Sequence, residues 1–264
     1  MDPSLLLIPA IAIGSCIFVL WLISVQIKDA SIADIWWGPG FAVVAWTSGL
    51  GLEHFSGRHV LAAFLFSLWG IRLGIYLGRR NIGHGEDRRY QAMRGGSPHF
   101  WWVSFFQVFL LQGGLQLLVA MPIYAIASSG LPLGPLDALG AAVVLAGIAT
   151  EATADNQLRA FKKEASNKGK VMREGIWGWS RHPNYFGNAL MWMGFGLLGM
   201  AADAPLWIWM GPGVMWFLLL RVSGVAMLER TIVDRRPSYR DYIEEVSAFI
   251  PMPPKRLTQQ RGSA

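Results

Sequence analysis

The sequence predicts an all-α integral membrane protein, and three observations support this fold class. Of the 264 residues, 53% are hydrophobic and only 15% are charged, and the mean hydropathy is +0.36. This composition is more apolar than that of a soluble domain and is typical of a chain that crosses a bilayer several times. The 13 tryptophans fit the same class, because indoles gather at membrane interfaces. No strand-like alternation is sustained, so the membrane-crossing segments should be helices.

Seven apolar runs are long enough to cross a bilayer, which takes about 20 residues. They cover residues 4–26, 33–52, 59–78, 101–128, 135–157, 184–202 and 205–228. We therefore expect a bundle of seven transmembrane helices in a single domain over 1–254, followed by a flexible tail at 255–264. The first run is too long for a signal-peptide core and starts acidic rather than basic, so we expect it to be retained.

The basic residues predict the orientation of this bundle. They gather in the first, third and fifth connections and in the C-terminal tail, whereas the other three connections contain only Arg58. Because Lys and Arg are enriched on the cytoplasmic side, the N-terminus should lie outside and the C-terminus in the cytoplasm. This pattern accounts for the net charge of +6 without a nucleic-acid partner. With one cysteine and no zinc-ligand spacing, we expect no metal.

The second run carries Asp34, Trp37 and Phe41 on one helical face. A carboxylate at a helix start either caps the helix, because that end favours anions, or faces a cavity as a proton donor. Both interpretations of Asp34 remain open from the sequence. The charged loop at 85–90 is either a solvated charge run or part of a cofactor lid, and composition favours the solvated run.

The third run has two different faces. One face carries glycines at every fourth position, which is typical of close helix packing. The opposite face carries Trp69, Arg72, Tyr76 and Arg79. Arg72 lies within the apolar run, where a charge should face protein or water rather than lipid. This face therefore either lines a ligand cavity or holds an internal structural pair.

The fifth run should continue beyond the membrane as a helix. It carries Glu151, Asp155, Arg159 and Lys162 within one narrow arc, with carboxylates at the membrane end and cations at the other. Ion pairs on a solvated helix would explain this arrangement. It also suits a ligand with one polar end and one phosphate end, because Arg and Lys are the usual phosphate partners.

The stretch at 175–188 is the densest polar cluster in the chain. It contains two indoles, a guanidinium, an imidazole, an amide and a phenol, from Trp177, Trp179, Arg181, His182, Asn184 and Tyr185. Pro183 suits the first turn of a helix, and the free N–H groups there attract anions. The sequence therefore predicts a binding site at the start of the sixth helix.

Two other features of the C-terminal third need an interpretation. The run at 194–199 matches G-x-G-x-x-G, but no strand precedes it, so we expect packing glycines rather than a dinucleotide fingerprint. The tail at 235–251 is compact and aromatic, and we expect it to fold back and close the site from below.

Several motifs together resemble the bacterial relatives of the steroid 5α-reductases over roughly residues 30–253. They are Asp34-Ile-Trp-Trp-Gly38, Trp69-Gly-Ile-Arg-Leu73, Glu86-Asp-Arg-Arg-Tyr90, Arg181-His-Pro-Asn-Tyr-Phe-Gly187, Glu229 and Phe249-Ile-Pro251. The Arg-His-Pro-Asn-Tyr core is similar to that of the sterol reductases and isoprenylcysteine carboxyl methyltransferases as well. It is therefore more specific for the superfamily than for the reaction.

The resemblance implies a helical bundle that opens to the cytoplasm of a bacterial inner membrane and binds NADPH. The implied reaction is reduction of the C4–C5 double bond of 3-oxo-Δ4 steroids or similar lipid enones. The implied cofactor contacts are Asp155, Arg159, Lys162, Arg173, Trp179, Arg181, His182, Asn184, Tyr185, Glu229 and Tyr239. Glu229 stands where the alignment places a family histidine.

The chain differs from the family at the residues that hold the substrate. In the steroid reductases a Glu on the second helix and a Tyr on the third hold the ketone oxygen, and here Trp37 and Trp69 replace them. We expect these indoles and Arg72 to bind substrate, with Asp34 or Tyr76 as the proton donor. The partners expected are the enone and membrane lipid, and no protein partner is evident.

Two other functions remain open from the sequence. An S-adenosylmethionine-dependent methyltransferase shares the Arg-His-Pro-Asn-Tyr region, but its cofactor has no phosphate for Arg159 and Lys162 to bind. A non-catalytic lipid or sterol binder would explain the missing Glu and Tyr, but it does not need so dense a polar cluster.

Overall fold

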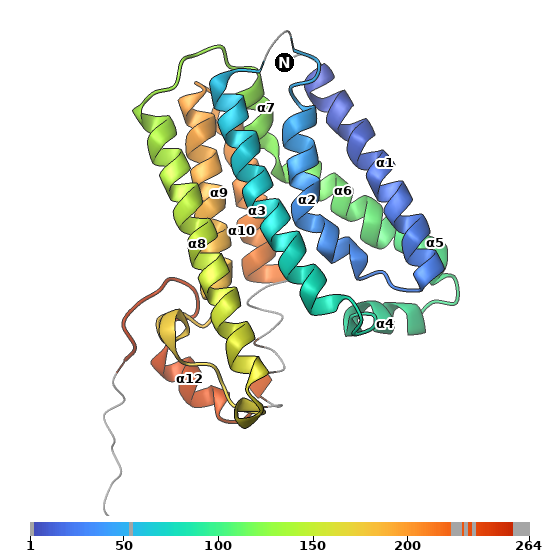
Figure 1. Ribbon diagram of the computed structural model, residues 1–264, viewed down its shortest axis with the longest axis vertical. Coiled ribbons are helices and arrows are strands. Elements are labelled where there is room, and N and C mark those ends of the chain that lie inside the picture. The colour runs from blue at the N-terminus through green and yellow to red at the C-terminus, as the bar shows by residue number, and fades with distance from the viewer. Residues whose placement is uncertain (1–2, 53–54, 223–228, 230–231, 234–235, 256–264) are drawn as a thin grey trace, which may run out of the picture. The chain divides into compact units, whose positions relative to one another are not determined.

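The computed structural model describes residues 3–52, 55–222, 229, 232–233 and 236–255, and within them it contains helices and no strand (Figure 1). The chain forms two compact units. Unit 1 comprises Met1–Ala141 and Phe195–Gly211, and unit 2 comprises Ala142–Gly194 and Pro212–Ala264. Each is described by itself below, and the single domain expected over 1–254 stays a prediction.

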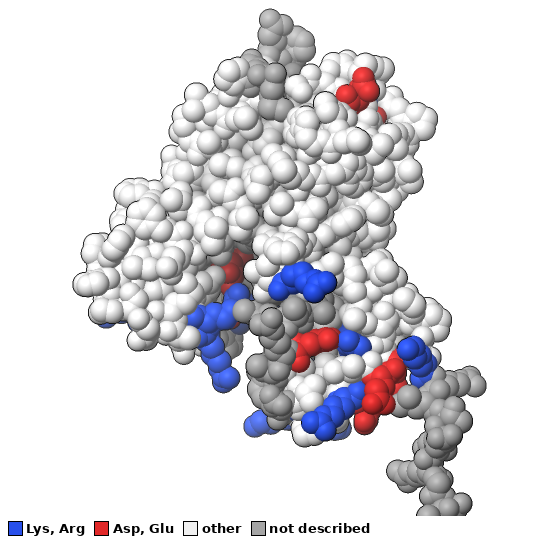
Figure 2. Space-filling model, turned by 180° about the vertical axis from the view of Figure 1, so that it is seen from behind, with Lys and Arg blue, Asp and Glu red and all other residues white. Residues whose placement is uncertain are grey.

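Four helical segments among the described residues are long and apolar enough to cross a membrane. They are α1 (Ser4–Ile27), α3 (Gly57–Asn81), the segment Phe100–Val119 and α8 (Pro135–Lys163), and a shorter apolar helix covers Leu206–Val222. Most of the surface shown in Figure 2 is uncharged, as expected where side chains face lipid. The protein is therefore an all-helical membrane protein, while the count of seven spans and the orientation stay predictions.

The glycine face predicted on α3 is confirmed. Helix α2 (Ile32–Thr47) is shorter than the predicted run and contacts both α1 and α3. A side chain at Gly70 would collide with the backbone of Gly38, and one at Gly74 would press on Pro39. Small residues therefore let the two helix backbones approach closely, as is common between membrane helices.

The predicted fourth run is interrupted rather than continuous. It consists of α5 (Phe100–Ser104), the π-helical η1 (Phe105–Leu110), α6 (Leu111–Val119) and, after a break, α7 (Met121–Ala127). Ala120 leaves the helical conformation, with φ −74° and ψ 7°. Helix α7 begins at Met121, and Pro122 lies in its first turn, where the missing N–H of proline is tolerated. Helix α4 (Arg88–Gly95) precedes this segment.

The last third of the chain contains the helix that was expected to start at Pro183. Helix α9 (Pro183–Ala201) begins at Pro183 as expected, after η2 (Ala165–Asn167) and η3 (Gly175–Gly178). It is followed by η4 (Leu206–Trp209), α10 (Met210–Phe217), η5 (Leu218–Val222) and α12 (Tyr239–Glu245).

The packing interpretation of the G-x-G-x-x-G run is confirmed at two of its glycines. A side chain at Gly196 would collide with the Trp209 ring, and one at Gly199 would collide with Ile208. These positions are small because helix backbone and side chains lie directly against them, and no strand accompanies them in the described chain.

Candidate functional site

Within unit 2, helices α8 and α9 bring carboxylates and amides together in two rungs. The Asn184 amide donates to Asp155 Oδ1 at 3.5 Å, and the Asn188 amide donates to the two oxygens of Glu151 at 3.5 and 3.4 Å. Gly147 and Gly187 allow this approach, since a side chain at either would collide with the facing backbone.

Both rungs are buried, and the hydrogen bonds that join their amides to their carboxylates are long. Asp155 is 3% exposed, Glu151 5% and Asn188 6%, while the three distances exceed those of strong hydrogen bonds. Asn188 Oδ1 has no hydrogen-bond partner within the described residues. A buried amide usually has its hydrogen bonds satisfied, so the Asn188 oxygen suits a ligand that offers a donor.

The cationic end of the same helix is open to solvent. Arg159 and Lys162 are exposed, and Arg159 donates to Asn156 Oδ1 at 3.1 Å. The carboxylates of α8 are therefore buried and its cations exposed, while their placement relative to a membrane stays a prediction. The role of these cations in binding a phosphorylated ligand stays a prediction as well.

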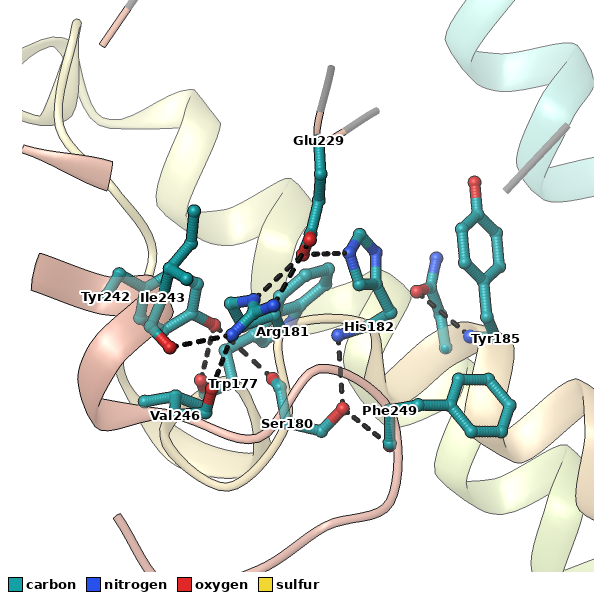
Figure 3. Close-up of polar contacts among 11 residues, drawn as sticks. Trp177, Ser180, Arg181, His182, Tyr185, Glu229, Tyr242, Ile243, Val246 and Phe249 are labelled. Carbon is teal, nitrogen blue, oxygen red and sulfur yellow. Dashed lines mark hydrogen bonds and ion pairs between the residues drawn. The ribbon is translucent and has the colours of Figure 1, made fainter. Parts of the chain in front are cut away.

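Arg181 and Glu229 are the centre of a densely bonded group among the described residues of unit 2 (Figure 3). The Arg181 guanidinium donates to both Glu229 oxygens, at 2.8 and 3.1 Å, and to the carbonyls of Ile243 and Val246 at 2.9 and 2.7 Å. The His182 ring donates to Glu229 as well, at 3.0 Å. The Arg181 side chain is only 8% exposed, so it fastens the C-terminal segment to the start of α9.

This environment keeps Glu229 ionised. Burial by itself raises the pKa of Glu229, but hydrogen bonds from His182 and Arg181, together with their charges, lower it to about 2. The carboxylate therefore acts as an acceptor for two neighbouring residues at any physiological pH.

Ser180 and Tyr242 complete the attachment of the tail. Ser180 Oγ donates to the Phe249 carbonyl at 2.8 Å and accepts from the His182 N–H at 3.1 Å. The buried Tyr242 hydroxyl donates to the Trp177 carbonyl at 2.6 Å. The prediction that the tail folds back onto the stretch at 175–188 is thus confirmed, while closure of a site stays a prediction.

The remaining predicted cofactor residues have varied surroundings. Arg173 is ion-paired to Glu245 at 2.8 Å and lies over the Tyr242 ring. Tyr185 stacks on His182 with ring centroids 5.6 Å apart and planes 5° apart, so the two form a flat aromatic face. Trp179 is 50% exposed.

Tyr239 is 5% exposed, and burial raises its pKa to about 12. It contacts Tyr242 edge to face, with ring centroids 5.2 Å apart. Its phenol therefore stays protonated in this part of the tail.

In unit 1 the carboxylate of Asp34 is fully engaged. Its oxygens accept from the Tyr90 hydroxyl at 2.7 Å and from Arg89 at 2.6 Å. The Arg89 side chain also donates to Asp87, at 3.0 Å. Asp34 therefore anchors the loop that follows α3 instead of capping α2. The solvated charge run expected at 85–90 is confirmed at Arg88 and Arg89, which are exposed, whereas Tyr90 is buried.

Tyr76 lies between two cations. The guanidinium carbons of Arg72 and Arg80 are each 6.0 Å from the centre of its ring. Arg72 and Tyr76 thus share a face of α3, as their spacing predicted. The role of Tyr76 as proton donor stays a prediction.

The two indoles predicted to bind substrate lie in an aromatic row. Trp37 contacts Phe41 edge to face at 5.2 Å, and Phe41 contacts Trp69 at 5.6 Å. Trp69 is completely buried. It therefore contributes to the core of unit 1, and a substrate role for either indole stays a prediction.

Sequence reasoning did not assign two groups that the structure brings into these clusters. Glu151 and Asn188 form the second rung, and the spacing of four residues from Asp155 and Asn184 was the available signal. Tyr90 lies in a charged loop and showed no signal of burial, since its partner Asp34 is distant in sequence.

Comparison with known proteins places this geometry in a family. Residues 20–246 match the family described as "Protein of unknown function (DUF1295)". The "Uncharacterized protein C594.04c" of Schizosaccharomyces pombe (strain 972) is 28% identical over 267 residues, covering 88% of this chain and 76% of that protein. No solved structure matches the chain. Because the family match extends over most of its length, the chain belongs to the DUF1295 family of membrane proteins.

Proposed function

We propose that this protein is an NADPH-dependent reductase of lipid enones, of the 3-oxo-5α-steroid 4-dehydrogenase type. The observation that carries the proposal is the pair of buried rungs between α8 and α9, continued by Arg159 and Lys162 on the same helix. A nicotinamide amide has one acceptor and two donors, which suits the rungs. Phosphate groups suit the exposed cations.

The proposal includes a membrane arrangement. Seven spans, with the N-terminus outside and the C-terminus inside, would place the cofactor residues on the cytoplasmic side of a bacterial inner membrane. The gathering of Lys and Arg in alternate connections supports this orientation. The end of the proposed seventh span, at 223–228, lies outside the described residues.

One set of residues would orient the cofactor, and another would stabilise the ketone oxygen of the substrate. Asp155, Asn184, Glu151 and Asn188 would orient the nicotinamide end of the cofactor, and bound NADPH would supply the hydride for the β-carbon of the enone. Tyr76 would hydrogen-bond the ketone oxygen, while Arg72 and Arg80 stabilise the negative charge that develops there. Between the two expected donors, Tyr76 is favoured because Arg89 and Tyr90 occupy both oxygens of Asp34.

The runner-up is a methyltransferase that uses S-adenosylmethionine. The Glu229 cluster at the start of α9 does not discriminate between the two cofactors, because its hydrogen bonds join protein groups to one another. The exposed cations at the end of α8 favour the phosphorylated cofactor, because S-adenosylmethionine carries no phosphate.

Calorimetry with the purified full-length protein separates these functions. NADPH should bind and S-adenosylmethionine should not. Asp155→Ala and Asn184→Ala should each weaken NADPH binding about 10- to 100-fold, the effect of losing a buried hydrogen bond to a charged or polar partner. Asp241→Ala, which removes an exposed carboxylate of α12, is the matched control and should bind as the wild type does.

A second measurement tests the chemistry. NADPH oxidation should rise above background with progesterone or with another lipid enone in the same panel. Binding of S-adenosylmethionine alone would support the methyltransferase. Absence of binding by both cofactors would support a lipid or sterol binder.

A further inference from the structure

A basic surface in unit 1 shares only Arg80 with the chemistry proposed above. The last turn of α3 and helix α4 carry five arginines within 16 positions: Arg79, Arg80, Arg88, Arg89 and Arg94. Two of them are neutralised locally. Arg94 donates to both oxygens of Glu86, at 2.9 and 2.8 Å, and Arg89 pairs with Asp34 and Asp87.

The other three arginines give this segment a surplus of positive charge. Arg79, Arg80 and Arg88 are exposed, and none of them forms an ion pair with a carboxylate of the described chain. The nearby carboxylates are held in their charged form by the paired arginines. Burial by itself raises the pKa of Glu86, but hydrogen bonds from Arg94 and the Ala30 N–H lower it below its usual value. The charge of Arg80 also helps to lower the pKa of Asp87. The five arginines still outnumber the three carboxylates Asp34, Glu86 and Asp87, so the segment keeps a surplus of two positive charges.

This basic segment is fixed in place rather than loose. Glu86 accepts from the Ala30 N–H at 2.9 Å, and the Asp87 N–H donates to Ser31 Oγ at 2.7 Å. The Tyr90 hydroxyl adds a third bond to the start of α2, through Asp34. A partner would thus meet cations displayed from an ordered backbone, which lowers the entropic cost of binding.

Exposed apolar side chains lie between the arginines and after them in the sequence. Ile82 is 72% exposed, Trp101 54% and Trp102 45%. The Trp21 ring donates to the Trp101 carbonyl at 2.8 Å, which ties α5 to the C-terminal part of α1. Figure 1 shows α4 and α5 at the same end of α1 and α3. Indoles and guanidinium groups together are typical of the level of lipid headgroups.

We propose that residues 79–102 form a docking surface for anionic phospholipid headgroups. Guanidinium groups bind phosphate oxygens through several hydrogen bonds, and the exposed indoles would lie among the glycerol groups. Each basic residue near an anionic membrane surface contributes about 1 kcal/mol. This inference does not depend on the reductase proposal, because it is tested at Arg79 and Arg88, which that proposal does not use.

Native mass spectrometry of the full-length protein in detergent tests the surface. In an equimolar mixture of phosphatidylglycerol and phosphatidylcholine, the wild type should retain phosphatidylglycerol preferentially. Arg79→Gln/Arg88→Gln should lower this preference about 10- to 30-fold, as expected for two basic residues. Arg79→Lys/Arg88→Lys keeps both charges and should keep most of the preference.

The control removes the same charge elsewhere. Lys163→Gln/Lys168→Gln changes two exposed cations of unit 2 and should leave the preference unchanged. An undiminished preference in the Arg79→Gln/Arg88→Gln protein would overturn the proposal. An equal loss of preference in the Lys163→Gln/Lys168→Gln protein would also overturn it, because lipid retention would then follow net charge alone. Release of phosphatidylglycerol by NADPH would assign the arginines to a nucleotide instead and overturn it too.

Discussion

Two carboxylates in different units are bound in the same way, by an arginine and the ring residue that follows it. Glu229 is bound by Arg181 and His182, and Asp34 is bound by Arg89 and Tyr90. The contact distances are similar, between 2.6 and 3.1 Å. A local pattern of two adjacent residues is thus used twice in the chain to fasten one segment to a distant one.

The two groups differ in how much water reaches the arginine. The Arg181 side chain is 8% exposed and also donates to two backbone carbonyls, whereas the Arg89 side chain is 44% exposed and shares a second carboxylate, Asp87. Water can replace a lost partner at Arg89 but hardly at Arg181. The same pattern should therefore stabilise unit 2 strongly and unit 1 weakly.

The largest expected effect comes from Arg181→Gln. It would leave the Glu229 carboxylate and the carbonyls of Ile243 and Val246 without their donor, and breaking a partly buried ion pair in this way costs about 3–5 kcal/mol. Chemical unfolding in detergent, followed by tryptophan fluorescence, measures the loss. A stability within 1 kcal/mol of the wild type would show that Arg181 does not hold the tail.

The pH dependence of stability should follow Glu229. Its pKa is lowered in the folded protein to about 2 from 4.5, so its contribution is fully present above pH 4.5 and is lost as pH falls toward 2. Unfolding curves between pH 6 and pH 2.5 should therefore show a steeper loss for the wild type than for Glu229→Gln. Parallel curves would mean that this carboxylate is not linked to folding.

Asp34→Asn should have a smaller effect on stability, and it tests whether Asp34 has a structural role or donates a proton to the substrate. The amide still accepts from Tyr90 but loses its ion pair with Arg89, so stability should fall by about 1–2 kcal/mol. If the reductase proposal holds, kcat for the enone should fall less than tenfold, against about 100-fold or more for Tyr76→Phe. The reverse order of the two kcat values would make Asp34 the proton donor.

Much of the fold could be predicted because it depends on local patterns. The start of α9 at Pro183, the extension of α8 to Lys163 and the glycine face of α3 all follow from spacing and residue type. The break at Ala120 was not predicted, because hydropathy does not register a short departure from helical backbone within an apolar run. Pro122 was the available signal.

The candidate site was predicted less completely, because its contacts join residues that are distant in sequence. The composition of the stretch at 175–188 indicated polar groups, but it did not show that Arg181 donates to Ile243 and Val246. The charged loop containing Tyr90 looked solvated, since its acceptor Asp34 lies 56 positions away. Composition identifies which groups are available, and only the fold determines which of them bind one another.

Arg89→Gln should have the smallest effect and makes the comparison between the two arginines direct. Removing a 44% exposed guanidinium from Asp34 and Asp87 should cost about 0–1 kcal/mol, because water solvates both carboxylates and Tyr90 still donates to Asp34. Measured beside Arg181→Gln under the same detergent conditions, it changes the same residue type and removes the same charge. Equal losses in the two variants would mean that burial does not distinguish the two groups, and high salt should weaken only the exposed one.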